Sequence, residues 1–112
     1  MAQTNPPFMS GVPELLVLRL LARKEMYGYE IVKDVRVITQ EAIRLGEGVI
    51  YPVLHGLERN GSLKARRKAV NGRMRVYYSL TPTGRGRLER LSQEWGRISN
   101  GIKSALGDPQ NA

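Results

Sequence analysis

The sequence predicts an α+β fold in which three short helices are followed by a two-stranded β-hairpin and one long helix. Four segments carry apolar residues at helical spacing, and two segments of alternating character flank an Asn-Gly pair. With 112 residues the chain has the size of one domain and room for a modest core. Its net charge of +8, from 18 Lys and Arg against 10 Asp and Glu, favours an anionic partner.

The first helix is expected to begin at Pro13, because proline suits the first helical turn. It ends near Arg23 and Lys24, whose cations suit a helix C-terminus. Apolar residues cover much of its circumference, which places it at the centre of the domain. Before it, residues 1–9 are expected to form a flexible arm, since Asn5-Pro6-Pro7 is too stiff and polar to join a core.

The second helix opens at Tyr27-Gly28-Tyr29 and follows the i, i+3, i+4, i+7 pattern. The pattern is carried by Gly28, Ile31, Val32, Val35 and Ile38. Residues 39–45 either extend this helix or form a short connector.

The third helix follows the break at Gly46-Glu47-Gly48 and stops at Asn60-Gly61. Its buried stripe consists of Ile50, Val53, Leu54 and Leu57. Helical projection puts Gly48, Pro52, His55 and Arg59 on the opposite face, with Tyr51 and Gly56 at its edges. Pro52 is expected near the start of the helix, because deeper inside it would remove a hydrogen bond and clash with the preceding turn.

The hairpin turns at Asn71-Gly72, a pair suited to the positive φ angles of a type I′ turn. A two-residue loop pairs Val70 with Arg73 and thereby fixes the register. One face is then mostly apolar and suited to lying on a core: Ala69 opposite Met74, Arg67 opposite Val76, Ala65 opposite Tyr78, and Leu63 opposite Leu80. The other face is basic: Lys68 opposite Arg75, Arg66 opposite Tyr77, Lys64 opposite Ser79, and Arg73 near the tip.

Like charges directly across a ladder destabilise it, so this basic face is best explained by a polyanion that neutralises it. The alternative is a solvated face that keeps the sheet edge from aggregating. The position of the hairpin after a short helix favours binding. Three helices followed by a basic hairpin are the arrangement of a winged helix-turn-helix, whose third helix enters the major groove while the wing meets phosphate.

The last helix starts at Thr81-Pro82 and runs to about Leu106. Its apolar residues follow a heptad seam: Leu88, Leu91, Trp95, Ile98 and Ile102. The seam either packs on its own domain or pairs with a second subunit, and the second is favoured because the earlier elements already complete a core. A twofold dimer predicts an inverted-repeat operator with half-sites about 10 bp apart or a multiple of that spacing. Trp95 either packs in this interface or, with Ile98, stacks against a planar aromatic effector.

The predicted organisation is therefore an arm over 1–9, a DNA-binding domain over 10–80, a dimerisation helix over 81–106 and a tail over 107–112. The chain has no Cys and one His, and its acids are scattered, so neither catalytic residues nor a metal or other cofactor are expected. No apolar run approaches the ~20 residues of a membrane-spanning helix. Residues 1–9 do not resemble a secretory signal, so a cytoplasmic protein is expected.

Three segments resemble the PadR family of transcriptional regulators: residues 48–61, Tyr27-Gly28-Tyr29-Glu30-Ile31, and residues 77–84. The single final helix is similar to the small subfamily. The resemblance implies a dimeric, mostly repressing transcription factor that acts on inverted repeats, and some small members bind aromatic drugs between subunits near a tryptophan. The chain departs from the family at Gly46 and Val49, where many members carry phosphate-binding hydroxyls.

The expected contacts to double-stranded DNA come from the third helix and the wing: Gly48, Val49, Tyr51, His55, Arg59, Lys64, Arg66, Lys68, Arg73 and Arg75. His55 and Arg59 are the long polar side chains on the helix face, so specificity should depend on DNA shape and the wing as well as on base contacts. The main alternative is an RNA-binding winged helix, which would display stacking aromatics, whereas only Tyr77 points outward on the hairpin. A protein-interaction module is a third class, which leaves the charge of the wing unexplained.

Overall fold

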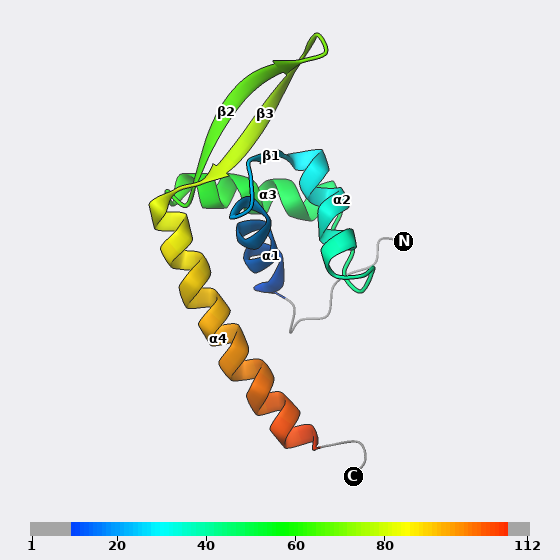
Figure 1. Ribbon diagram of the computed structural model, residues 1–112, viewed down its shortest axis with the longest axis vertical. Coiled ribbons are helices and arrows are strands. Elements are labelled where there is room, and N and C mark those ends of the chain that lie inside the picture. Colours follow the sequence, from blue (N-terminus) through cyan, green and yellow to red (C-terminus); the bar gives the residue numbers. More distant parts are fainter. Residues whose placement is uncertain (1–9, 108–112) are drawn as a thin grey trace.

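The computed structural model describes residues 10–107. The element order is α1 (Val12–Leu21), β1 (Met26–Tyr27), α2 (Gly28–Ile38), α3 (Glu47–Arg59), β2 (Leu63–Val70), β3 (Arg73–Leu80) and α4 (Pro82–Leu106). The arm predicted over 1–9 and residues 108–112 of the predicted tail lie outside the described residues. In Figure 1 the hairpin projects from one side of the body formed by α1, α2 and α3, and α4 leaves the body in the opposite direction.

One apolar core joins all four helices to the base of the sheet. Its fully buried members on the helices include Val17, Leu18, Leu20, Ile31, Val35, Ile50 and Leu54. The hairpin contributes Leu63 and Tyr78, and α4 contributes Leu88. The buried stripe predicted for α3 is confirmed, except that Val53 is only partly buried.

The sheet has three strands in the order β1-β3-β2, where the sequence predicted two. In the added pairing, Met26 lies opposite Tyr78 and Tyr27 opposite Tyr77. β1 was missed because a strand of two residues is too short to show alternation. It adds the residues just before α2 to the β3 edge of the hairpin, where Tyr27, opposite Tyr77, shares the side of the sheet that carries the basic side chains.

The predicted register of β2 and β3 is confirmed at every pair from Val70 opposite Arg73 to Leu63 opposite Leu80. Asn71 and Gly72 have φ angles of 52° and 77°, the signs that a type I′ turn requires. The prediction that the whole apolar face lies on a core is wrong for its outer half. Leu63 and Tyr78 are buried, but Arg67, Ala69, Met74 and Val76 are exposed because the hairpin extends beyond the helices.

The structure decides one helix boundary that the sequence left open and corrects another. Residues 39–45 form a connector, in which Gln40 and Glu41 take positive φ angles and the Thr39 hydroxyl accepts a hydrogen bond of 3.1 Å from the Ile43 N–H. α3 begins at Glu47, so Pro52 lies inside the helix rather than near its start. Its ring is exposed there, and only the main-chain bond to the Gly48 carbonyl is lost.

The long helix α4 is fixed to the body at its N-terminal end. The Thr81 hydroxyl caps it by accepting the Gly84 N–H at 3.0 Å. One turn further along, Arg87 forms an ion pair with Glu14 of α1. The orientation of α4 relative to the first helix is therefore set by a cap, an ion pair and the burial of Leu88.

Candidate nucleic-acid interface

The exposed face of α3 has the composition predicted from the sequence. Gly48, Pro52, His55 and Arg59 are all exposed, while Val49 is partly buried at the edge of the core. This face is narrow and has few long side chains, and its first main-chain N–H groups lie at a helix N-terminus, where they favour anions.

Tyr51 is held by the domain more firmly than the sequence suggested. Its ring packs against Gly28 at the start of α2 so closely that a Cβ atom there would lie 2.6 Å from the ring. The ring centre also lies 6.2 Å from that of His55. Tyr51 therefore helps to hold α3 against α2, and this contact explains the glycine between the two tyrosines that open α2.

The five predicted wing cations lie on β2 and β3. Lys64, Arg66, Lys68 and Arg73 are exposed, and Arg75 is half-buried. Two of these cations share an acidic partner that sequence reasoning missed. The Oε1 atom of Glu25 accepts hydrogen bonds from Arg66 Nη2 at 2.7 Å and from Lys68 Nζ at 3.1 Å.

The hydrogen bond from Lys68, followed by that from Arg66, holds the pKa of the Glu25 carboxyl below its usual value. Glu25 immediately precedes β1, and the pairing of β1 with β3 brings it to the basic face of the hairpin. Like charges on that face are therefore partly neutralised within the chain, by a carboxylate that the interpretation of this face as a polyanion site did not include.

Two wing cations, Lys68 and Arg75, also lie over tyrosine rings. Lys68 Nζ lies 4.8 Å from the centre of the Tyr77 ring, and the Arg75 guanidinium carbon lies 4.4 Å from that of Tyr27. The two rings meet edge to face with their centres 5.4 Å apart. The outward Tyr77 is thus covered by a cation, which makes it a poor platform for stacking a nucleobase.

The other face of the wing adjoins α3 and supplies a cation that the prediction omitted. Arg67 is exposed and lines a shallow depression with His55, Glu58 and Val76. Sequence reasoning assigned Arg67 to the core-facing side from its pairing with Val76, but the core ends before this pair. The depression joins the exposed face of α3 to the wing in one continuous surface.

The heptad seam of α4 divides into a covered part and an exposed part. Leu88 is only 7 % exposed and belongs to the core of its own domain, so its prediction as a dimer contact is corrected here. Leu91 packs partly against the same core. Trp95, Ile98 and Ile102 are 46 %, 44 % and 52 % exposed, because α4 has by then left the body. Trp95 and Ile98 line an apolar groove with Val12 and Leu15 of α1.

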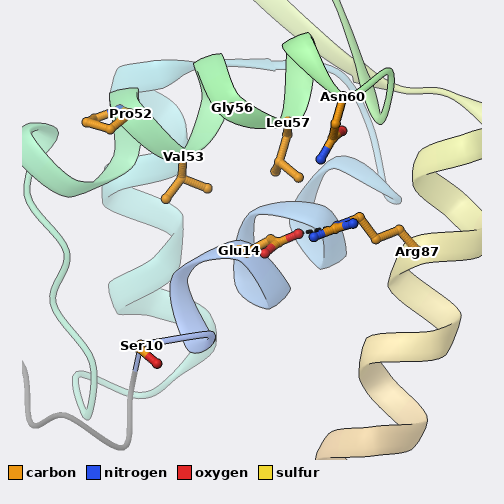
Figure 2. A pocket seen from close by; sticks show the side chains of 8 residues that line it. All are labelled: Ser10, Glu14, Pro52, Val53, Gly56, Leu57, Asn60 and Arg87. Carbon is orange, nitrogen blue, oxygen red and sulfur yellow. Dashed lines mark hydrogen bonds and ion pairs between the residues drawn. The ribbon is translucent and has the colours of Figure 1, made fainter.

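A second hollow lies where α1, α3 and α4 meet, and Figure 2 shows Arg87 reaching across it to Glu14. Pro52, Val53 and Gly56 form its α3 side. The hydrogen bond to Glu14 raises the pKa of Arg87 above its usual value. The ion pair between Arg87 and Glu14 makes this hollow a structural junction between α1 and α4.

The residues that the structure describes contain no group of three acidic or histidine side chains placed to hold a metal ion. Over the same part of the chain, no helix combines the length and the apolar character needed to cross a membrane.

Comparison with known proteins identifies the family. Residues 17–90 match the model of the transcriptional regulator PadR-like family. A transcriptional regulator of Mycobacterium tuberculosis is 32% identical over 81 residues, which cover 72% of this chain and 73% of the relative. The crystal structure of a PadR family transcription regulator from Clostridium difficile is 34% identical, with a TM-score of 0.76 over 87% of this chain and all of that one.

A transcriptional regulator from Clostridium thermocellum aligns with a TM-score of 0.80 and 30% identity over 87% of this chain and 95% of that chain. These neighbours confirm the predicted winged helix-turn-helix fold with its long last helix. Proteins of the family regulate transcription and are not enzymes, which implies DNA-binding regulation for this chain. The chain belongs to the PadR-like family of transcriptional regulators.

Proposed function

We propose that this protein is a homodimeric repressor that binds an inverted-repeat operator in double-stranded DNA and acts in the cytoplasm. The observation that carries the proposal is the surface formed by the exposed face of α3 and the adjoining side of the wing, which meet at His55 and Arg67, with the five predicted cations on the opposite side of the same hairpin. Such a surface matches a helix in the major groove flanked by phosphate contacts.

The proposed DNA contacts divide by role. His55 and Arg59 meet base edges, and the main-chain N–H group of Gly48 meets phosphate with help from Tyr51. The Val49 N–H already donates to the Gly46 carbonyl at 3.1 Å. On the wing, the proposed phosphate contacts come from Lys64, Arg66, Lys68, Arg73 and Arg75, and Arg67 is proposed as a further one because its side chain is exposed. Lys64 and Arg73 are exposed, so they need no rearrangement to reach a phosphate.

The proposed dimer forms through the exposed part of α4. Trp95, Ile98 and Ile102 form an apolar stripe on a helix that has left its own body, and a second copy would bury it. Residues 10–80 would then act as the DNA-binding unit and 81–106 as the dimerisation helix. Repression would follow from occupancy of the operator.

A planar aromatic effector would act at the apolar groove beside Trp95 and Ile98. It would relieve repression by changing the angle between the two recognition helices, and its effect is limited to its differential affinity for the two arrangements. Fluorescence titration of Trp95 with a varied panel of planar aromatic and cationic compounds tests this part. Absence of quenching across the whole panel would remove the effector from the proposal.

The deciding experiment is binding of the purified protein to duplex DNA fragments from around its own gene, at two salt concentrations, with structured RNA as competitor. Tight, salt-sensitive binding to one duplex that resists RNA and saturates at two chains per site is the expected result. Uniformly weak duplex binding with a preference for RNA would instead favour an RNA-binding winged helix.

A further inference from the structure

We propose that Glu25 is a built-in competitor of DNA phosphate: it occupies Arg66 and Lys68 in the free protein and lowers the affinity of the wing for any duplex. This inference rests on the proposed function, because it assigns a regulator to the same wing surface.

The geometry is that of a carboxylate standing in for a phosphate group. One oxygen, Oε1, receives both cations, at 2.7 Å from Arg66 and 3.1 Å from Lys68. The two partners lie 41 and 43 residues further along the chain, so the arrangement depends on the β1–β3 pairing rather than on local sequence. A carboxylate and a phosphate oxygen offer these donors the same acceptor chemistry.

The exchange is feasible because all three side chains remain accessible. The side chains of Arg66 and Lys68 are 60 % and 46 % exposed, and that of Glu25 is 30 % exposed. An ion pair at such a surface is weak, so a DNA backbone can displace the carboxylate. Lys68 would keep the Tyr77 ring beneath it, which leaves its ammonium group near the position where a phosphate would arrive.

The exchange also affects counterions. DNA releases condensed cations when the wing neutralises its phosphates. Glu25, once it has lost its partners, attracts a cation from solution and offsets part of that release. The wild-type protein should therefore show a shallower dependence of binding on salt than the number of its wing cations suggests.

The test compares Glu25→Gln with the wild type on operator and unrelated duplexes over a series of salt concentrations. Removing the competitor should tighten binding to both duplexes by about two- to fivefold at low salt. The salt slope should steepen by up to about one unit. The ratio of operator to unrelated affinity should stay constant, because phosphates are the same in both.

Two controls separate this mechanism from a general charge effect. Glu89→Gln makes the same change in net charge at an exposed position on α4, and it should leave binding nearly unchanged. In a background that carries Arg66→Ala and Lys68→Ala, Glu25→Gln should have no effect, since the cations that it releases are absent.

Unchanged or weaker binding by Glu25→Gln would overturn the inference and show that the carboxylate instead orients the cations or is inert. An equal gain from Glu89→Gln, or a gain that persists without Arg66 and Lys68, would overturn it as well. These results leave the proposed function intact, whereas a wild-type protein that shows no salt-sensitive duplex binding would overturn both.

Discussion

Gly84, in the first turn of α4, packs directly against the main-chain carbonyl of Ser62, with no space between them for a side chain. The Ser62 carbonyl also accepts the Thr81 N–H at 3.0 Å, and the Thr81 hydroxyl caps α4 through Gly84. The start of α4 is thus fixed to the end of α3 and the beginning of β2 by main-chain contacts. The direction in which α4 leaves the body follows from this junction.

Gly84→Ala should therefore lower the free energy of unfolding by about 1–3 kcal/mol, the usual cost of forcing an extra carbon into a packed site. The Ser62 carbonyl belongs to the main chain, so it cannot rotate away from the added methyl group as the end of a side chain could. The matched control is Gly86→Ala in the same helix, where a Cβ atom meets open space. That change should raise the free energy of unfolding by about 0.5–1 kcal/mol, because alanine has a higher helix propensity than glycine. Urea unfolding of both variants measures the difference, and equal effects would contradict the close packing at Ser62.

Arg75→Ala should weaken binding to all duplex sequences alike. Its guanidinium lies over the Tyr27 ring on the proposed phosphate-binding face, and its loss should lower the salt slope by about one. Arg90→Ala, an exposed change of equal charge on α4, serves as the control and should have little effect. Fluorescence anisotropy with operator and random duplexes measures both. A changed sequence preference with an unchanged slope would show that the wing reads bases.

The elements that the sequence predicted well are those defined by local chemistry. The register of the hairpin follows from Asn71 and Gly72. This pair tolerates the positive φ angles of a two-residue type I′ turn, and such a turn fixes which residues of the two strands lie opposite each other. The contact between Glu25 and Arg66 had no such signal, since it joins positions 41 residues apart through a strand of two residues. The charges and the alternation of side chains within one segment do not indicate which other segments become its neighbours in the fold.

The same limit applies to an apolar stripe on a helix, which can either pack on its own domain or remain exposed. Leu88 and Trp95 occupy equivalent positions in the heptad pattern of α4, yet one is buried in its own domain and the other is half-exposed. The spacing of apolar residues predicts that a stripe will be covered, but the length of the body beside the helix decides how far its own domain covers it. Arg67 shows the converse, since a residue on the core-facing side of a strand becomes exposed where the core ends.

Ile98→Asp should convert the proposed dimer into monomers. A charged side chain in the centre of the exposed stripe would be desolvated on association, and the dimer dissociation constant should rise by at least about tenfold. Asn100→Asp introduces the same charge at another exposed position of α4 and should leave the assembly intact. Analytical ultracentrifugation distinguishes the two states. If Ile98→Asp stays dimeric, the subunits associate through another surface.

Selection of binding sites from randomised duplexes should return few fully specified base pairs in each half-site. On the exposed face of α3, as described by the structure, His55 and Arg59 are the long basic side chains, while Tyr51 is held against Gly28. Most discrimination should then come from groove width and deformability, which appear as correlated preferences among neighbouring base pairs.

The same selection with the variants Arg59→Ala and His55→Ala tests which base pairs depend on these two side chains. Each should relax the preference at only one or two base pairs and should leave the correlated preferences in place; for Arg59, loss of a bidentate contact should cost about 1–3 kcal/mol. The salt slope should change little, because phosphate contacts remain on the wing. Selection that yields many independent, fully specified positions would contradict shape readout, and it would require further base contacts from side chains that the structure places outside this face.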